Sequence, residues 1–551
     1  MIKRWTGKIG GMILTIALTA GMITGCAGKQ EESEQTQKEN YVTATLFCDV
    51  NHWNPPAWDL SEDSITGKIT KKTGVQLDTT VPAQDADLRL KILMVNDELP
   101  DLISVTDETV ISQLVTSGKV WNLEEFLKKY KPDSHLLKDF PEDLKKEMIR
   151  RDRAWYALPS HINSEDARAY WKQDEFWTNY QDYSDNNAII WNIALLKEFG
   201  IDTENLQTME QVLAAYEKVK GKKTKAGQTV IPLLVDGKNY RDPTLKYLEG
   251  TFGAEWVDEN GDFKDILLQP QTKTALSFLN IAARKGYMDS SQLTWENLKV
   301  KETLDTQPVL CFIGNIANTG IEQGDWTSTG VILSPDGSSP VMGKSKRANG
   351  WMSTFVSKKC KHPEEVAEFI DYMTSVDGMM DWYYGEEGED YTVGEDGKYY
   401  RTKQGQKLAD ASHLGTWWMF ENTAWERSVQ GITRQEEEDM YQVMAQYGSN
   451  KHTVIYDASL LFMPADLLAD NNKIKDIQSS IELWKTDSIS QVVLAESEEA
   501  FEQEYEKMLQ GLYERGIEQL DDKKNEAYQE NCRVYGSKIE KVSTAWSRKT
   551  R

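Results

Sequence analysis

Hydrophobic and polar positions follow two different periods along the chain after residue 40. Residues 41–50, 74–82 and 100–106 are short apolar stretches rich in β-branched side chains, which predicts strands. Residues 61–73 and 85–97 lie between them and are predicted to be helices, the second of them amphipathic. Strands that alternate with helices of this length predict parallel sheets with crossover helices, and therefore an α/β fold.

The same alternation continues to the end of the chain, without an internal repeat. Thr208 is the expected N-cap of one later helix, and Pro363 stands at the start of another. Apolar residues recur every three or four positions from Phe501 to Tyr513, which predicts a helical C-terminal region. Further strands are predicted at 188–192, 309–315 and 350–358, helices at 208–221 and 362–375, and a hairpin with an Asn-Gly turn at 256–268.

The first 25 residues have the order of a secretory signal. Lys3, Arg4 and Lys8 precede an apolar run, and small residues follow it. The run is shorter than the roughly 20 residues that a membrane-spanning helix needs. Ile23-Thr24-Gly25-Cys26 resembles a bacterial lipobox, in which the cysteine is acylated and becomes the first mature residue. The alternative is an ordinary signal peptide with an incidental cysteine.

Residues 26–40 are rich in Glu, Gln, Lys and Ser, and we expect a flexible tether there. With two or three acyl chains on Cys26, the protein would be held at the extracellular face of the cell membrane, because one chain binds a bilayer only marginally.

Charge and cysteine usage exclude several classes of function. The net charge is −25, and without the three cations of the signal it becomes −28. A protein this acidic is not expected to bind nucleic acid, because phosphate binding depends on Lys and Arg. Cys48, Cys311, Cys360 and Cys532 are far apart and form no C-x-x-C pair, and no histidines have H-x-x-x-H spacing. We therefore expect no disulfide framework, no metal site and no cofactor.

Several stretches, taken in order, resemble the extracellular solute-binding proteins of ABC importers, specifically the large lipoprotein subgroup associated with oligosaccharide uptake. The resemblance spans nearly the whole mature chain, although Trp191 stands where the family commonly has arginine. The stretches that carry it are "KKTGVQLDTTVP", "LRLKILMVNDELPDLISV", "AIIWNIALLKEFGID", "WMSTFVSKKCKHPEEVAEFIDYMTSVDG", "WYYGEEGEDYTVGEDGKYY" and "ESEEAFEQEYEKMLQGLYERGIEQL".

The resemblance implies a monomer with two α/β lobes, a hinge and a ligand cleft between the lobes. It also implies ABC permease subunits as partners. Lobe 1 is expected to comprise residues 41–158 and 353–410, and lobe 2 residues 159–352 and 411–551. Ligands of open α/β sheets bind beyond the carboxyl ends of the strands, which fits such a cleft.

An oligosaccharide would need flat aromatic rings for its C–H faces and fixed polar groups for its hydroxyls. The chain has 18 tryptophans, and several stand in polar or Gly/Pro-rich stretches, where packing is the alternative to binding. Trp256 and Trp484 are expected to pack. The candidate ligand-binding residues are Asn51, His52, Trp53, Trp58, Asp107, Trp155, His161, Trp171, Trp177, Trp326, Trp351, Trp417 and Trp418. For Asp107, capping of a helix is an equal alternative.

Two other functions and one possible ion site stay open at this point. A peptide or signal receptor of the same fold would present strand-like polar edges instead of stacked rings. A glycan-cleaving enzyme could use paired carboxylates among Glu386, Glu387, Glu389 and Asp390, but acidic clusters are usually solvated. Residues 258–265 carry carboxylates that could suggest calcium, although a hairpin turn is the simpler reading because the segment is shorter than a 12-residue EF-hand loop.

Overall fold

A five-stranded sheet forms the first half of the fold, in the order β2-β1-β3-β10-β4. β1 pairs in parallel with β2 and β3, whereas β10 is antiparallel to both β3 and β4. The expected parallel sheet is therefore mixed, because β10 enters from a distant part of the chain. The strands are β1 (Val42–Cys48), β2 (Val75–Thr80), β3 (Leu102–Val105), β4 (Ala157–Pro159) and β10 (Ser353–Val356).

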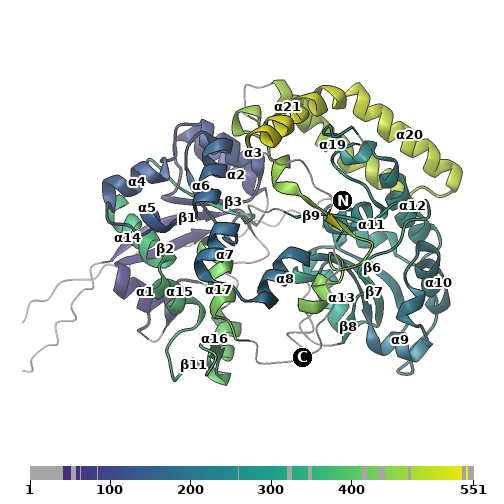
Figure 1. The fold of residues 1–551 in the computed structure, drawn as a ribbon, viewed down its shortest axis with the longest axis horizontal. Helices are drawn as coiled ribbons and strands as arrows, with labels where there is room; N and C mark the ends of the chain where they lie inside the picture. Colours follow the sequence, from purple (N-terminus) through teal and green to yellow (C-terminus); the bar gives the residue numbers. More distant parts are fainter. Residues whose placement is uncertain are drawn as a thin grey trace, which may run out of the picture. The chain divides into compact units, whose positions relative to one another are not determined.

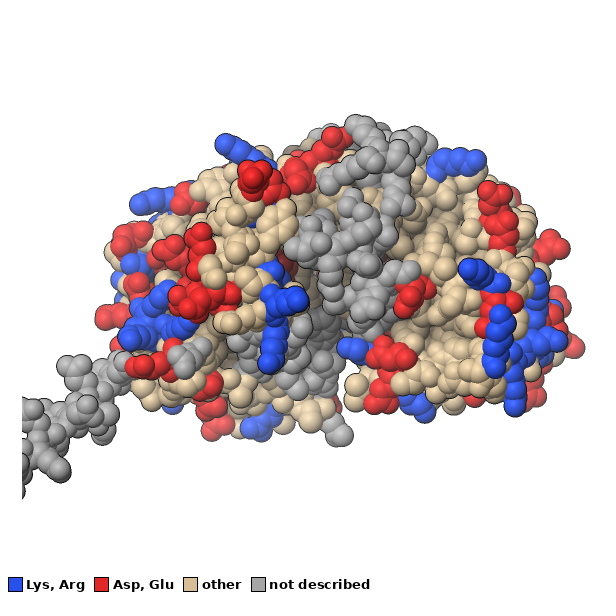
Figure 2. Space-filling model, turned by 90° about the horizontal axis from the view of Figure 1, so that it is seen from below, with Lys and Arg blue, Asp and Glu red and all other residues tan. Residues whose placement is uncertain are grey.

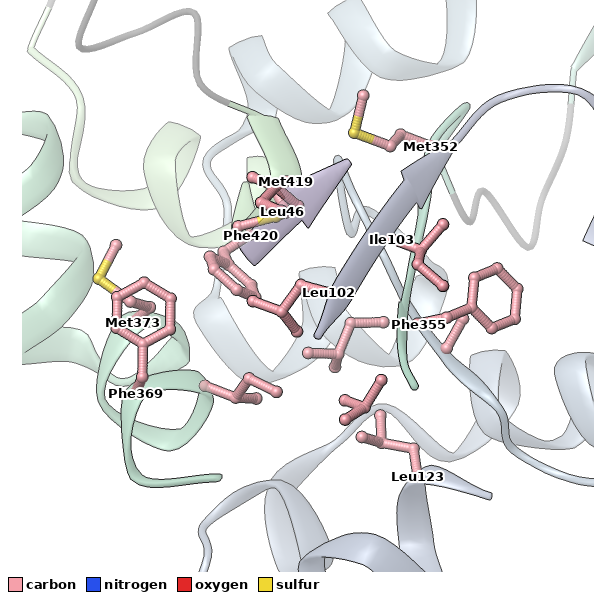
Figure 3. Packing of buried hydrophobic residues seen from close by; sticks show 14 of the residues in the cluster. Leu46, Leu102, Ile103, Leu123, Met352, Phe355, Phe369, Met373, Met419 and Phe420 are labelled. Atoms are coloured by element: carbon pink, nitrogen blue, oxygen red, sulfur yellow. The ribbon is translucent and has the colours of Figure 1, made fainter. Parts of the chain in front are cut away.

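Helices pack against this sheet in the computed structural model (Figure 1). Successive strand residues point to opposite faces. Figure 3 shows Leu102 and Ile103 of β3 doing so, with Phe369 and Met373 of α14 on the side of Leu102. The helices are α1 (Ile65–Thr73), α2 (Ala86–Asn96), α3 (Glu108–Thr116), α4 (Leu123–Tyr130), α5 (Leu136–Asp139), α6 (Glu142–Asp152), α7 (Glu165–Trp171), α14 (Pro363–Thr374), α15 (Val376–Tyr383), α16 (Lys403–Ser412) and α17 (Thr423–Val429).

A second, four-stranded sheet has the order β6-β7-β5-β8. β6 and β7 are parallel, and β5 is antiparallel to β7 and β8. The strands are β5 (Asn187–Asn192), β6 (Ile231–Val235), β7 (Val309–Asn315) and β8 (Trp326–Thr327). The helices of this half are α8 (Glu175–Tyr183), α9 (Ile193–Phe199), α10 (Met209–Val219), α11 (Pro243–Phe252), α12 (Pro270–Arg284), α13 (Asn297–Thr306), α19 (Lys473–Val493), α20 (Glu498–Glu514) and α21 (Ile517–Tyr535).

Two smaller sheets and several 3-10 helices complete the fold. β9 (Val341–Lys344), β13 (Val454–Asp457) and β14 (Val542–Ser543) form one sheet, and β11 (Tyr391–Val393) and β12 (Tyr399–Arg401) form the other. The 3-10 helices are η1 (Thr203–Asn205), η2 (Gly237–Asn239), η3 (Ile266–Leu268), η4 (Ser290–Thr294), η5 (Ile316–Asn318), η7 (Trp418–Phe420), η8 (Ala458–Leu461) and η9 (Ala465–Leu468).

The structure describes residues 41–50, 57–62, 64–83, 85–258, 260–318, 325–344, 350–412, 418–431, 441–468, 473–535 and 542–543. The chain from Tyr41 onward forms one compact unit, distinct from Met1–Asn40. Within the described part, no helix is long and apolar enough to cross a membrane.

The helix boundaries follow the local signals in the sequence. Thr208 caps α10 with a reciprocal capping box, in which the Thr208 hydroxyl accepts from Gln211 N and the Gln211 side chain accepts from Thr208 N. Pro363 occupies the first position of α14. Both predicted boundaries are confirmed. The prediction that residues 85–97 form an amphipathic helix is only half right, because Leu88, Ile92 and Val95 of α2 are exposed.

The two large sheets have separate hydrophobic cores. The first core includes Ile162 and Ala167, and also Met419, Phe420 and Trp425. These residues fall in segments that our sequence boundaries assign to lobe 2. The α/β fold class is confirmed, and the chain passes between the two cores later than 158 and again after 425, since α7 and α17 still pack on the first sheet.

Candidate functional site

A buried carboxylate stands where the parallel strands of the first sheet end. Asp49 follows β1, and its Oδ2 accepts hydrogen bonds from Thr106 N at 2.7 Å and from Thr106 Oγ1 at 2.9 Å, just beyond β3. Burial raises the pKa of Asp49 to about 6, against the lowering effect of these hydrogen bonds. The side chain therefore ties together two strand ends at the edge where ligands of α/β sheets usually bind.

The second sheet repeats this arrangement. Asp236 follows β6, and its Oδ2 accepts from Asn315 N, at the end of the parallel strand β7, at 2.8 Å. Its own backbone N–H donates to Thr244 Oγ1. Burial raises the pKa of Asp236 to about 6 as well. Sequence reasoning missed both residues, although an acid that directly follows an apolar strand is a signal that could have found them.

Three segments that are far apart in sequence meet beside the first sheet. Ser160 N donates to Met352 O at 2.9 Å, Ile162 N donates to Glu421 O at 3.1 Å, and Ala424 N donates to Ile162 O at 2.9 Å. Gly350 has φ 59° and lies so close to Ser160 O that a Cβ could not fit. We call these three stretches, residues 160–164, 350–353 and 421–427, the crossing segments.

A histidine–glutamate pair lies within the crossing segments. His161 Nε2 is 2.9 Å from Glu421 Oε2, and Thr423 Oγ1 donates to Glu421 Oε1 at 2.9 Å. Burial alone would raise the Glu421 pKa, but the charge of His161 and the hydrogen bonds from His161 and Thr423 lower it. Burial, followed by the charge of Glu421, raises the pKa of the neighbouring Glu426 to about 7.

Arg427 extends this polar cluster toward the second half of the fold. Its guanidinium lies 4.7 Å from the centre of the Tyr180 ring and 5.4 Å from that of the Trp177 ring. Both aromatic residues belong to α8. Its Nη1 donates to Gln181 Oε1 at 3.1 Å, and Asn163 Nδ2 donates to the same oxygen at 2.6 Å. Residues of both halves thus share one hydrogen-bond network.

Lys344, a half-buried cation, lies at the end of β9. Its Nζ donates to Ser184 O at 2.5 Å. Burial lowers its pKa to about 8, although the carboxylates of Asp185 and Asp182 act in the opposite direction. On the face seen in Figure 2, Lys and Arg are interspersed with Asp and Glu. The charges of the fold therefore do not gather into a single-sign surface on that face.

The predicted aromatic candidates are distributed between surface and core. Trp351 is 43% exposed, and its ring centre lies 6.4 Å from that of His161, so the structure brings these two candidates together. Trp326 is half-buried in β8. Trp171 lies beside a cavity in the first half of the fold.

Three other candidates have packing roles. Trp155 is buried, its ring centre is 4.5 Å from that of Phe140, and its Nε1 donates to Ala157 O. Trp177 is buried against Tyr180 and Tyr441. Trp58 is half-buried and donates to Thr70 Oγ1 at 2.8 Å. These contacts favour packing over ligand binding at all three positions.

Asp107 is the N-cap of α3, and its Oδ1 accepts from Val110 N at 2.9 Å. In the structure, Asp107 therefore caps a helix, which was the alternative to ligand binding. The side chain of Trp418, the first residue of η7, is not described. Five further predicted residues lie outside the described part of the chain: Cys26, Asn51, His52, Trp53 and Trp417.

The tryptophans expected to pack do so. Trp256 stacks on Phe263 with 5.8 Å between ring centres, and Trp484 Nε1 donates to Met508 O at 2.9 Å. Trp191, at the position that departs from the family pattern, is fully buried and donates to Thr329 Oγ1. It is therefore a core residue of the second sheet.

In both acidic stretches, an aspartate carboxylate accepts backbone hydrogen bonds that stabilise a turn. Asp258 Oδ1 accepts from Asn260 N and Asp262 N, which closes the turn before Phe263. No cluster of potential metal ligands occurs among the described residues. In the other stretch, Asp390 is buried and its Oδ2 accepts from Glu386 N, while Glu386 pairs with Lys68 at 2.8 Å.

The chain is similar to known proteins in its fold and in the sequence pattern of one family. A comparison of the sequence with curated proteins finds no match. The fold is similar to that of the substrate-binding protein FusA of the ABC transporter of Streptococcus pneumoniae, solved with kestose (TM-score 0.66, 16% identity, 90% of this chain and 100% of that chain). It is also similar to an HMO-binding solute-binding protein of Bifidobacterium longum infantis (TM-score 0.63, 11% identity, 89% and 99%).

A third similar structure is the N-glycan transport solute-binding protein NgtS of Streptococcus pneumoniae, solved with Man1GlcNAc (TM-score 0.55, 14% identity, 89% and 99%). These similarities show a two-lobed solute-binding fold. The family model of the bacterial extracellular solute-binding proteins matches residues 60–380, which is more than half of the sequence. The chain therefore belongs to the bacterial extracellular solute-binding proteins.

Proposed function

We propose that the protein is a non-catalytic, lipid-anchored receptor that binds an oligosaccharide between its two lobes and delivers it to an ABC permease. The observation that carries the proposal is the exposed indole of Trp351 beside the His161–Glu421 pair, where three distant segments meet beside the first sheet of a solute-binding fold. An indole face and polar groups held in place by hydrogen bonds are the two kinds of group that a sugar ring needs.

One carboxylate at the strand ends of each large sheet is a further candidate acceptor for hydroxyl groups. Asp49 and Asp236 each use one oxygen to tie strand ends. Carboxylates held in this way accept hydrogen bonds without rearranging, which favours affinity. The kestose and Man1GlcNAc complexes of the similar structures support an oligosaccharide as the ligand class.

An enzymatic function receives less support. Glu386 and Asp390, two of the four acids that could serve hydrolysis, fix the turn before β11 through the Glu386 N–Asp390 Oδ2 hydrogen bond and the Lys68–Glu386 ion pair. General acid catalysis needs a carboxyl group that reaches the leaving oxygen. We therefore propose binding without turnover, and expect purified protein to leave a bound oligosaccharide intact.

The first test is a titration of intrinsic tryptophan fluorescence with oligosaccharides, including kestose, Man1GlcNAc and plant, mucin and storage sugars. We expect a saturable change with one sugar class. Replacing Trp351 with Ala should weaken that binding by about tenfold, because one stacked aromatic contact contributes roughly 1.4 kcal/mol. The measurement is the dissociation constant of each variant.

Trp256→Phe is the matched control, because Trp256 packs on Phe263 in the 256–268 hairpin. It should leave affinity unchanged. If no sugar changes the fluorescence of the folded wild-type protein, the proposal is contradicted. Peptides, the second ligand class considered for this fold, would then be tested.

Membrane anchoring is tested separately at Cys26. We expect Cys26→Ser to abolish incorporation of labelled palmitate and to release the protein from the membrane fraction, because the thiol is the proposed acylation site. Cys532→Ser removes a half-buried cysteine of α21 and should leave the protein in the membrane fraction. Continued membrane retention of the Cys26→Ser protein would show that another element anchors it.

A further inference from the structure

The first half of the fold contains a cavity of about 390 Å³ that the proposed function does not use. Its walls come from α5, α7, the end of β4 and the junction of α14 with α15. Ile162 and Asn422 of the crossing segments line it, but Trp351, His161 and Glu421 do not. A volume of this size lies within the range of small-molecule sites in proteins.

Aromatic rings form one wall. Tyr170 and Trp171, the last two residues of α7, meet edge to face with 4.8 Å between ring centres, and Tyr170 is 60% exposed. Phe140 and Phe420 contribute further aromatic surface. Ser164 caps the start of α7, and Lys172 ends the helix in a left-handed conformation, so the wall has a defined position. Tyr170 presents far more surface to solvent than an aromatic residue of the core does.

Hydrogen-bond acceptors face this wall from the other elements. Asp371 Oδ1 accepts from Ser134 Oγ at 2.6 Å and from His135 N at 3.0 Å. His135 Nε2 lies 3.0 Å from Thr374 Oγ1 and 3.1 Å from Asp371 O. The network joins α14 to the start of α5 and holds the Asp371 carboxylate at the cavity.

The charges of the lining favour a neutral ligand. Asp133 pairs with Lys131 at 3.2 Å, and the Asp371 carboxylate already accepts hydrogen bonds from Ser134 Oγ and His135 N. Of the three lining aspartates, Asp139 takes part in neither of these contacts. A cationic ligand would seek uncompensated acids, whereas hydroxyl groups need acceptors of the kind present here.

We propose that this cavity is a second saccharide-binding site, for one or two sugar rings, separate from the site between the lobes. Tyr170 and Trp171 would contact the C–H face of a ring, and Asp139 and Asp371 would accept hydrogen bonds from its hydroxyls. The site lies within one lobe, so it stays formed whether the lobes are open or closed.

The test uses the intact protein and a panel of methyl glycosides of glucose, galactose, mannose and N-acetylglucosamine. Saturation-transfer NMR should detect binding of at least one of them. Tyr170→Ala and Asp139→Asn should each weaken that binding by about tenfold, because a stacking face or a charge-assisted acceptor is lost. Tyr513→Ala, which removes a tyrosine of α20 that is 50% exposed, is the matched control and should have no effect.

A second measurement separates this site from the lobe interface. Trp351→Ala should leave methyl glycoside binding unchanged even where it weakens oligosaccharide binding, and the two results can fail independently. The proposal is overturned if no methyl glycoside binds to the folded protein, if Tyr170→Ala and Asp139→Asn bind as tightly as wild type, or if Trp351→Ala abolishes the signal. Binding of alkylammonium ions in place of glycosides would also overturn it.

Discussion

Replacing Lys485 with Met should lower the free energy of unfolding by about 3 kcal/mol at pH 7. Lys485 is buried in α19, and its Nζ lies 2.7 Å from Asp265 Oδ2 and 3.3 Å from Glu482 Oε1. Methionine has a similar length but no charge, so the buried Asp265 carboxylate would lose its nearest cation. The expected loss is at the low end for a broken buried pair, because Lys524 also lies in the field of Asp265. Chemical denaturation of both proteins measures it.

Two further variants test whether the loss of stability comes from the buried Lys485–Asp265 pair. Lys507→Met removes an exposed lysine that pairs with Glu504 at 3.0 Å, and it should change stability by no more than about 0.5 kcal/mol. Asp265→Asn combined with Lys485→Met should recover part of the loss, since asparagine keeps the oxygen that accepts from Leu267 N. Equal losses for Lys485→Met and Lys507→Met would mean that burial does not govern this pair.

The secondary structure could be predicted because its signals are local. The capping box at Thr208 and the proline at the start of α14 are set by residues within one helical turn. The family resemblance places residues 353–410 in lobe 1, but the antiparallel pairing of β10 could not be predicted from the local pattern, because it joins residues about 200 to 250 positions apart. Strand order depends on long-range pairing, whereas strand content depends on the local pattern of side chains.

The tryptophans show the limit of a composition argument. Trp155, Trp177, Trp191 and Trp425 are all fully buried, although two of them were candidates for ligand binding. A polar stretch of sequence does not reveal whether its aromatic side chain points into the core or toward solvent. Three of the four lie in α8, β5 and α17, where large aromatic side chains gain free energy by burial, so a surplus of tryptophan in the composition is not by itself a sign of ligand binding.

The polar part of the candidate site could not be read from sequence for a different reason. His161 and Glu421 are 260 positions apart, and their pairing exists only because the crossing segments exchange backbone hydrogen bonds. Asp49 and Asp236 were detectable one at a time, as acids after apolar strands. Their equivalence became visible only when both sheets showed the same tie between parallel strand ends.

The contact region of α11, η3, α19 and α21 buries further ionisable groups around Lys485. Glu249 of α11 is 5% exposed, and its Oε1 has no hydrogen-bond partner within the described part of the chain. Burial raises its pKa from an ordinary value of 4.5 to about 8, with a further contribution from Asp265, while Lys485 and Thr272 act against the shift. Asp521 of α21 is buried as well, and its pKa is raised to about 6.

The raised Glu249 pKa predicts that stability falls as the pH rises. Between pH 4.5 and about 8 the folded protein keeps the Glu249 proton that the unfolded chain has lost, so the free energy of unfolding decreases through this window. Glu249→Gln removes the titration. We expect it to match wild type near pH 5 and to be more stable by about 2 kcal/mol or more at pH 8.5. Denaturation at several pH values measures the difference.

Asp521 contributes a slope of the same sign between pH 3.8 and about 6 in both proteins, so the comparison above pH 6 isolates Glu249. Glu302→Gln, on the exposed side of α13, is the control and should follow the wild-type curve at every pH. Parallel curves for Glu249→Gln and wild type from pH 6 to 8.5 would show that the carboxyl group finds solvent or a cation when it ionises. A wild-type slope that is lost in Glu249→Gln would instead identify this one buried acid as the group that lowers the stability of the protein between pH 6 and 8.5.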